Sequence, residues 1–437
     1  MEAEKQRMYL CIDGKSFYAS VECAERGLNP FETNLVVADP SRGKNALCLA
    51  ITPKMKALGV HNRCRLSDIP GNIKYEIAVP RMSLYVDYCA DIYALYLNYF
   101  AAEDIHVYSI DEAFIDVTSY LYTYGMDAKQ LAKKLMNEIA DKLHVPTTAG
   151  IGTNLYLAKI ALDISAKKTK DHMGYLDEEI FRKTLWDHTP LTDFWGIARG
   201  TVNRLGHYGI FTVRDIANAS PDLLYKVFGI NAELMIDHAW GRETCLMSDI
   251  KKYHSKSHSV SFSQILPRDY DYEEAAVVMA EMAIHGCLEL YKRHVITKKV
   301  WIGVGYSRYE QCPPAQGTIK LSCATQLSSI IEPAVKQKFR EIVSWGIPIR
   351  NLAISFCDTR DEGCEGYDLF TDWEKVDKEK AVERTVLEIR DRFGKNAVLR
   401  GINLNKAGTQ RERNTFIGGH RAGYDDERTA RETIHAL

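Results

Sequence analysis

Two adjacent carboxylates lie where one short apolar run of the chain gives way to the next. Asp111 and Glu112 follow the run that begins at Tyr108 and precede the run that ends at Ile115. Successive side chains on a regular strand point to opposite faces, so two neighbouring acids can serve one site only where the chain turns. Their repulsion raises the pKa of one of them unless a cation lies between them. The pair fits Mg²⁺, which prefers a few hard oxygen ligands, but on this pattern alone an acidic hairpin turn is an equal alternative.

A third carboxylate ends the first apolar run. The residues from Met8 to Ile12 are typical of a buried strand, Asp13 follows them, and Gly14 opens a turn into a helix expected at 16–26. Ligand sites in α/β layers gather at the carboxyl ends of strands. Three acids at strand ends can hold two metal ions, which clamp the attacking and leaving oxygens of a phosphoryl transfer. A lone Asp in this place is more often a turn former or a helix cap.

Four motifs follow one another along the chain. They are Ile12-Asp13 with Phe17-Tyr18-Ala19-Ser20-Val21-Glu22, then Lys54-Met55-Lys56-Ala57-Leu58-Gly59-Val60, then Ser109-Ile110-Asp111-Glu112-Ala113-Phe114, and then Ala149-Gly150-Ile151-Gly152 with Leu157-Ala158-Lys159-Ile160-Ala161. In this order they resemble the Y-family translesion DNA polymerases, and among them the UmuC-like branch of Gram-positive bacteria. The resemblance runs from about residue 8 to about residue 410. It implies a template-directed, low-fidelity DNA polymerase that extends a primer 3′-hydroxyl in DNA damage tolerance, mutagenic repair and the SOS response.

The resemblance also implies a multi-domain α/β fold in the form of a polymerase right hand. The apolar patterns agree with it, because strands and helices alternate in the first part, strands are lost after residue 176, and two β-α-β halves follow from Val260. The expected domains are a palm at 1–27 and 76–175, small fingers at 28–75, a helix-hairpin-helix thumb at 176–242, a linker at 243–256, an α+β little finger at 257–408 and a flexible, polar, Arg-rich tail at 409–437.

By resemblance, Asp13, Asp111 and Glu112 are the catalytic acids and hold two Mg²⁺ ions, for which Mn²⁺ can substitute. Gly14 is expected to offer its carbonyl to one of these ions. Asp116 is expected to be structural rather than a ligand.

The same resemblance places further groups around an incoming deoxynucleoside triphosphate, namely Phe17, Tyr18, Thr52, Lys56 and one of Lys167 and Lys168. The spacing from Lys159 is one residue longer than usual, so the choice between the last two lysines stays open, and Lys159 itself is expected to be helix surface or packing. Ser16 and Pro53 depart from the aromatic residues of several relatives. Tyr18 is expected to exclude the ribose 2′-hydroxyl by a clash; packing of the first helix on the sheet is the alternative.

Primer-template DNA is the expected macromolecular partner. Residues 251–360 carry 15 Lys and Arg against 10 Asp and Glu, a modest excess that is also found on ordinary surfaces. A Gly turn before a helix, as at Gly196, can present backbone N–H groups to a phosphate, although a plain helix-turn-helix packing unit is the alternative. The other candidate phosphate contacts are Lys256, Ser257, Ser259, Arg308 and Lys320.

A second expected partner is the sliding clamp. The segment from Gly366 to Phe370 resembles the pentapeptide by which bacterial polymerases dock on their clamp, with Tyr367, Leu369 and Phe370 as contacts. Gly366 stands where glutamine is usual, and an apolar pair in an acidic loop can also pack on its own domain.

Composition excludes little. The 437 residues include 56 Lys and Arg and 58 Asp and Glu, so the whole chain has no basic excess. The eleven cysteines form no Cys-x-x-Cys pairs, there is no apolar leader, and no run approaches the roughly 18 residues that span a bilayer. We expect a cytoplasmic monomer with reduced thiols and no membrane association. Two rival classes remain, a nucleotide cyclase with a two-metal palm and a non-catalytic scaffold of polymerase shape.

Overall fold

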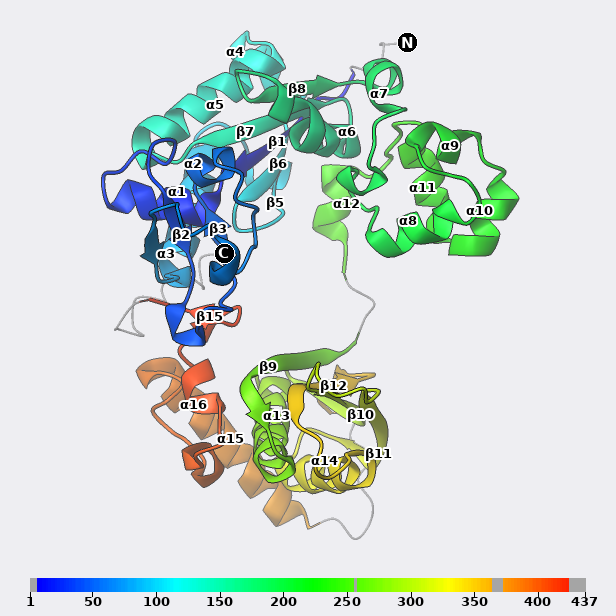
Figure 1. Ribbon diagram of the computed structural model, residues 1–437. Coiled ribbons are helices and arrows are strands. Elements are labelled where there is room, and N and C mark those ends of the chain that lie inside the picture. Colours follow the sequence, from blue (N-terminus) through cyan, green and yellow to red (C-terminus); the bar gives the residue numbers. More distant parts are fainter. Residues whose placement is uncertain (1–5, 255–257, 364–371, 424–437) are drawn as a thin grey trace. The chain divides into compact units, whose positions relative to one another are not determined.

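The computed structural model describes residues 6–254, 258–363 and 372–423. It divides into two compact units, of which the first comprises Met1–Pro80 and Leu84–Tyr253 and the second Arg81–Ser83 and His254–Leu437 (Figure 1). Within the described ranges, none of the helices combines the length and the apolar character that crossing a bilayer requires.

A five-stranded sheet forms the centre of the first unit. Its order is β5 (Ile105–Val107), β6 (Glu112–Asp116), β1 (Tyr9–Gly14), β7 (Thr147–Gly152) and β8 (Met173–Leu176). β1 runs antiparallel to both β6 and β7, whereas β7 and β8 are parallel. The three central strands are buried along almost their whole length, as expected for strands that are covered on both faces.

The helices of this layer are α1 (Phe17–Glu25), α3 (Met82–Leu97), α4 (Tyr120–Tyr124), α5 (Ala128–Leu143) and α6 (Leu155–Ile160), with a 3₁₀ turn at Ala102–Asp104. α6 crosses β7 so closely that a Cβ on Gly150 would lie 2.1 Å from the carbonyl oxygen of Ala158. Only glycine permits this approach.

The chain after α6 changes its helical type twice. A π-helical turn covers Ala161–Ser165 and a 3₁₀ turn covers Ala166–Lys168. A π turn takes one residue more than an α turn. It therefore accommodates the additional residue between Lys159 and Lys167 that the sequence contains.

A smaller sheet, in the order β3 (Ala50–Ile51), β2 (Leu35–Val37), β4 (Glu76–Ala78), lies between α1 and α3 in the sequence. It carries α2 (Pro53–Ala57) and 3₁₀ turns at Pro40–Arg42 and Leu66–Asp68. Its core is a compact cluster that includes Val36, Cys48, Ile51 and Met55.

The rest of the first unit is helical. Its helices are α7 (Glu178–Leu185), α8 (Arg199–Gly206), α9 (Val213–Asn218), α10 (Pro221–Phe228), α11 (Asn231–Ala239) and α12 (Met247–Lys252), with a 3₁₀ turn at Leu191–Asp193. α12 contacts β5 and buries Met247 in the cluster of Tyr9, Cys11 and Phe114. The prediction of a linker at 243–256 is wrong for this part, because the apolar side of α12 packs against the sheet.

The second unit contains a four-stranded antiparallel sheet in the order β11 (Ala315–Thr325), β10 (Val295–Tyr306), β12 (Ile349–Cys357), β9 (Val260–Tyr270), and the short β13 (Arg360–Asp361) pairs with β10. α13 (Tyr272–Lys292) and α14 (Ser328–Ile342) lie side by side against it (Figure 1). The alternating burial of the strands, together with the core cluster, shows that the described residues of this unit leave the other face uncovered. The predicted pair of β-α-β halves is confirmed.

The C-terminal part adds α15 (Trp373–Phe393), a 3₁₀ turn at Gly401–Leu404, α16 (Gln410–Arg413), β14 (Phe416–Ile417) and β15 (His420–Arg421). The buried Glu281 of α13 accepts hydrogen bonds from the side chain of Asn403 and from the backbone N–H groups of Thr409 and Gln410. The prediction of a flexible tail is therefore wrong at its first residues, because the buried Glu281 carboxylate binds their backbone.

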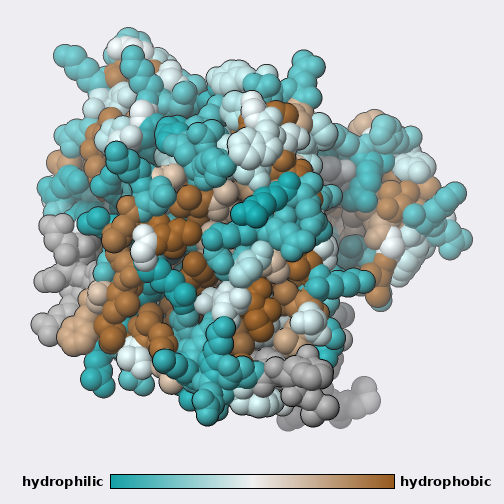
Figure 2. All heavy atoms as spheres, turned by 90° about the horizontal axis from the view of Figure 1, so that it is seen from below, coloured by the Kyte–Doolittle hydropathy of each residue, from teal (hydrophilic) through white to brown (hydrophobic). Residues whose placement is uncertain are grey.

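Large apolar side chains also occur on the surface. Figure 2 shows them in patches that hydrophilic side chains interrupt. Ile230 and Ile265 are among the most exposed. Scattered exposure of this kind is ordinary for folded proteins and identifies no site by itself.

Candidate active site

Asp13 and Glu112 face each other across the strand pair β1 and β6. They are direct partners in the antiparallel register, and the Gly14 N–H donates to the Asp111 carbonyl at 2.8 Å. Directly opposed residues project from the same face of a sheet. The turn from β5 to β6 adds Asp111 at the same end. The fold thus brings together the three carboxylates that the sequence predicted.

The electrostatic state of Asp13 reflects this crowding. Burial, and then the negative charges of Asp111 and Glu112, raise the pKa of Asp13 to about 8, against the opposing effect of Lys159. The carboxyl group therefore binds a proton at neutral pH unless a cation neutralises its neighbours. Hard oxygen donors that repel one another in this way are a suitable ligand set for a divalent cation.

Glu112 is held by two side chains of the protein. Its Oε1 accepts from the Cys11 thiol at 3.1 Å and its Oε2 accepts from Lys159 Nζ at 2.8 Å. Burial, together with the charge of Glu112, raises the pKa of the Cys11 thiol, so the thiol stays protonated and can donate. Among the described residues, no three His, Cys, Asp or Glu side chains form a preassembled metal cage, and Glu112 is directed to Cys11 and Lys159.

Lys159 corrects an expectation. Of the two alternatives, helix surface is wrong, because Lys159 is only 7% exposed; it is packed inside, where it contacts Asp163 at 3.2 Å besides Glu112. Burial disfavours its charge, but the bond to Glu112 and the charge of Asp163 outweigh this effect and raise its pKa. The spacing of Lys159 and Asp163, four residues apart, was the one signal in the sequence that could have indicated an ion pair.

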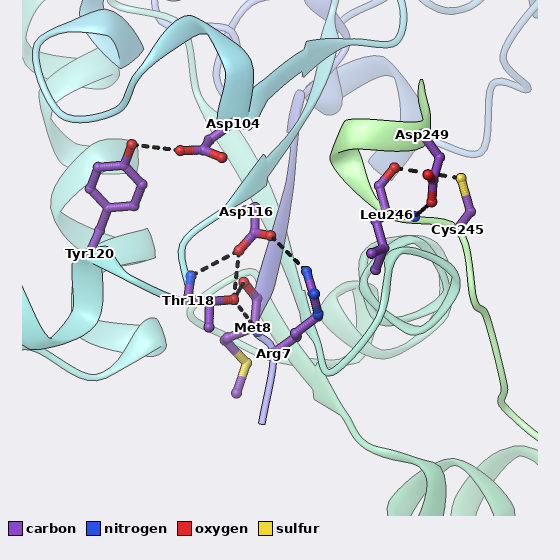
Figure 3. A network of polar contacts seen from close by, with 9 residues as sticks. All are labelled: Arg7, Met8, Asp104, Asp116, Thr118, Tyr120, Cys245, Leu246 and Asp249. Atoms are coloured by element: carbon purple, nitrogen blue, oxygen red, sulfur yellow. Dashed lines mark hydrogen bonds and ion pairs between the residues drawn. The ribbon is translucent and has the colours of Figure 1, made fainter. Parts of the chain in front are cut away.

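Asp116 lies at the other end of the strand pair, opposite Tyr9. Its Oδ1 accepts from the Thr118 hydroxyl at 2.6 Å and from the Thr118 N–H at 3.0 Å, and Arg7 lies 3.9 Å from its second oxygen (Figure 3). This carboxylate closes a turn, which agrees with the structural role expected for it.

Tyr18 lies beside the acidic end of the sheet. Burial and the charge of Asp111 raise the pKa of Tyr18. Its ring stacks on Tyr85 with centroids 4.5 Å apart, and the Tyr85 hydroxyl donates to Glu22 at 2.7 Å. Phe17, the first residue of α1, lies so close to the end of β1 that a Cβ on Gly14 would come within 2.8 Å of its ring. The orientation of Tyr18 is thus fixed by neighbouring aromatic and polar groups.

Thr52 does not present its side chain to a ligand. It is fully buried, its hydroxyl donates to the Thr33 carbonyl at 2.7 Å, and the same oxygen accepts from Leu35 N–H at 3.3 Å. The prediction of Thr52 as a nucleotide contact is therefore wrong, because the backbone of β2 and α2 uses the group.

Two of the predicted lysines lie near one another. Burial lowers the pKa of Lys56, Asp13 opposes this, and Lys15 and Lys167 add to it. Lys56 and Lys167 are therefore in one region with Asp13.

A chain of contacts connects Glu112 to the helical region of the first unit. Trp195 Nε1 donates to the Tyr108 hydroxyl at 3.1 Å, and the Lys159 ammonium lies 6.0 Å from the centre of the Tyr108 ring. Gly196 follows Trp195 with a φ of +85° and is exposed. The predicted phosphate contact is thus next to a residue that is anchored to the carboxylate end of the sheet.

The predicted contacts of the second unit do not form one cluster. Lys320 lies opposite Lys299 in the β10 and β11 pair, whereas Arg308 follows the far end of β10 and stacks over Tyr309. Ser259 is exposed just before β9. Lys256, Ser257, Tyr367, Leu369 and Phe370 lie outside the described residues.

Comparisons with known proteins agree with this geometry. The model of the impB/mucB/samB family matches residues 12–163, and the model of the impB/mucB/samB family C-terminal domain matches residues 257–369. UvrX, a candidate UV-damage repair protein of Bacillus subtilis (strain 168), is 30% identical over 419 residues, which cover 94% of this chain and 97% of UvrX. DNA polymerase IV 2 of the same organism is 29% identical over 423 residues, which cover 95% of this chain and 99% of that protein.

Among solved structures, the Y-family DNA polymerase chimera Dbh-Dpo4(243-245)-Dbh is similar with a TM-score of 0.61. The match covers 80% of this chain and 98% of the chimera at 19% identity. At this identity the likeness concerns the fold. It agrees with the multi-domain α/β architecture expected from the sequence.

Proposed function

This chain belongs to the Y family of DNA polymerases, in its UmuC-like branch, and on that premise we propose that Asp13, Asp111 and Glu112 are its catalytic centre. It is a DNA-directed DNA polymerase of the translesion type, which acts in DNA repair. The observation that carries the assignment is the register that sets Asp13 opposite Glu112, with Asp111 at the turn beside them.

The reaction joins a primer 3′-hydroxyl to the α-phosphate of a deoxynucleotide and releases pyrophosphate. Asp13, Asp111 and Glu112, with the Gly14 carbonyl, would hold two Mg²⁺ ions, or Mn²⁺ in their place, which lower the pKa of the attacking hydroxyl and neutralise the leaving group. Bound divalent cations would favour the deprotonated form of Asp13. Cys11 and Lys159 keep the Glu112 carboxylate in position before that, which supports an ordered ligand shell.

Tyr18 is proposed to lie under the sugar of the incoming nucleotide and to exclude a 2′-hydroxyl by a clash. The stacking on Tyr85 supports this role, because a ring that is held on one face cannot turn aside. Lys56 and Lys167 are proposed to face the triphosphate tail. The effect of Lys167 on the pKa of Lys56 supports Lys167 as the second lysine.

The uncovered face of the β9 to β12 sheet is proposed to bind primer-template DNA, together with the turn at Gly196. Lys299 and Lys320 are cross-strand neighbours on this face. Asp358 lies 3.7 Å from Lys299, but two ammonium groups side by side still repel each other, and DNA phosphates are anions that both of them can contact. Ser259 and Arg308 extend the proposed contact.

Primer extension on an undamaged template and on a template with an abasic site tests the function. We expect an elongated primer on both templates and no cyclic nucleotide from the same triphosphate. A cyclic product with no extension would instead identify a cyclase. Neither product from a folded protein would leave the non-catalytic scaffold as the correct reading, although a scaffold has no need of a charged cluster that raises the pKa of Asp13.

We further propose that the segment around Tyr367, Leu369 and Phe370 binds the bacterial sliding clamp and that the protein acts as a cytoplasmic monomer. Extended peptides with apolar anchors bind such pockets. Leu369→Ala with Phe370→Ala should remove stimulation by the clamp and leave synthesis without the clamp intact. Unchanged clamp affinity in calorimetry would contradict the assignment.

A further inference from the structure

Lys15 lies two residues beyond Asp13, at a position fixed by the backbone. Its N–H donates to the Pro146 carbonyl at 2.8 Å, which anchors it beside the start of β7. Its Nζ lies 3.4 Å from Nε2 and 3.5 Å from Nδ1 of His172, and 5.5 Å from the centre of the Phe31 ring. The side chain is half-buried, so it extends along the protein and not freely into solvent.

Two other lysines lie near Lys15. Lys56 is close enough to Lys15 and to Lys167 for both of them to disfavour its charge. In the part of the chain that the structure describes, no carboxylate lies within ion-pair distance of these three ammonium groups. Lys159, Lys129 and Lys142 each have such a partner. Asp13 favours the charge of Lys56, but one carboxylate does not balance three ammonium groups, so the region suits an anion from outside the chain.

His172 positions Lys15 without cancelling its charge. The residue has a φ of +56°, which turns the chain between the 3₁₀ turn and β8. Burial, and then the charge of Lys15, lower the pKa of His172, while Asp171 opposes them. The imidazole is therefore neutral at neutral pH, and one of its ring nitrogens can accept a hydrogen bond from the ammonium group.

We propose that Lys15, oriented by His172, is a further phosphate-binding residue for the incoming nucleotide and contacts its terminal phosphates. The inference rests on the proposed function, in which Asp13 marks the position of the α-phosphate. Lys56 and Lys167 then face the tail, and Lys15, which is near Lys56, supplies a third ammonium group. An ammonium bound to a phosphate oxygen makes a charge-assisted hydrogen bond, which is stronger than a neutral one.

A binding measurement without chemistry tests this role. The full-length protein is bound to primer-template DNA whose primer ends in a dideoxynucleotide, and the dissociation constant of the next correct deoxynucleoside triphosphate is measured. Lys15→Gln should raise this constant about tenfold, and Lys15→Arg should restore most of the affinity, because arginine keeps the charge. His172→Gln should raise it about threefold. Lys133→Gln, on the exposed side of α5, is the matched control and should have no effect.

Binding of the nucleoside diphosphate distinguishes the loss of a phosphate contact from a general distortion of the site. Because the diphosphate lacks the γ-phosphate, Lys15→Gln should weaken it less than the triphosphate, and in steady-state extension KM should rise more than kcat falls. A dissociation constant equal to that of the parent, or equal losses for both nucleotides, would overturn the inference and leave the polymerase assignment standing. A parent chain that binds no deoxynucleotide would overturn the proposed function and this inference with it. Should Lys15→Gln fail to fold, His172→Gln and Lys15→Arg carry the same test.

Discussion

The sheet of the first unit and the sheet of the second bury their strands differently. In β1, all residues from Tyr9 to Ile12 are at most 1% exposed. In β9, buried and exposed residues alternate, and β12 does the same. The first sheet is therefore covered on both faces, whereas the second is covered only where α13 and α14 pack.

This difference separates two tasks. Packing on both faces restricts the movement of a strand, so Asp13 and Glu112 are held in one geometry. Catalysis by electrostatic stabilisation needs such fixed charges. One-sided packing leaves a face of small and polar groups, on which Trp301 lies flat across Gly303. Such a face can meet the DNA backbone without reading its sequence. We expect changes in the first sheet to affect chemistry and changes on the open face of the second to affect DNA affinity.

The largest effect is expected from Asp111→Ala combined with Glu112→Ala. Extension should fall by about a thousandfold or more, because the divalent cations lose two of their ligands. Primer-template affinity should remain close to that of the parent, measured by fluorescence anisotropy. Asp116→Asn, on the same strand but at its other end, should keep extension. A double variant that still extended primers near the parent rate would contradict the assignment of catalysis to the first sheet.

The next effect concerns sugar selection. Tyr18→Ala should keep deoxynucleotide incorporation and raise the relative incorporation of ribonucleotides by about a hundredfold, because the proposed clash is removed. The ratio of the two kcat/KM values on one template measures it. If Tyr18 only packs α1 on the sheet, both sugars should slow alike and the ratio should stay constant, and the thermal midpoint should fall.

A smaller effect is expected on the open face of the second sheet. Lys299→Gln with Lys320→Gln should weaken primer-template binding about tenfold and reduce the slope of log affinity against log salt by about 2, one for each lost phosphate contact. Turnover at saturating DNA should not change. Lys336→Gln on α14, where Lys336 pairs with Glu332, is the control. An unchanged slope of log affinity against log salt would show that these lysines do not contact DNA.

The smallest effect concerns the covered face of the same sheet. Burial lowers the pKa of His285 to about 4; Glu289 opposes this, and Arg390, Lys395 and Arg413 add to it. Below about pH 6.5 the unfolded chain binds a proton at His285, whereas the folded chain does not. The free energy of unfolding is therefore highest above that pH and decreases as the pH falls towards 4.

His285→Gln should therefore reduce the loss of unfolding free energy between pH 7 and pH 5 by about 2 kcal/mol. Urea unfolding at the two pH values measures it, with the exposed His258→Gln as control. DNA affinity should not change. The same pH dependence in parent and variant would show that His285 does not titrate differently in the folded state.

Local sequence was sufficient for the elements that carry the acids. The runs before Asp13 and around Glu112 are short, apolar and bounded by turn residues, and the two β-α-β halves of the second unit have clear strand and helix periods. The proposal of Tyr18 as a nucleotide contact came from its position in the motif that begins with Ile12-Asp13. Each of these predictions depends on neighbours within one element or its turn, and such neighbours act regardless of the rest of the fold.

The helical ends and the C-terminal region were predicted less well. α12 and the segment after Thr409 are polar enough to look like a linker and a tail. They are ordered because Met247 enters a remote apolar cluster and because Glu281, more than a hundred residues away, binds the backbone at Thr409. Propensity is a weak guide when a distant contact decides the state of a segment.

The sequence by itself determined which residue types are present and in what order, and this was enough for the family and for the class of enzyme. Tertiary structure alone decided the partners. It paired Lys159 with Glu112 and bonded the Thr52 hydroxyl to the backbone beside the small sheet. It also gathered Lys15, Lys56 and Lys167 near Asp13. The physical reason is that a side chain's charge and hydrogen bonds depend on what lies within a few ångströms of it, and in a folded chain those neighbours come from distant segments.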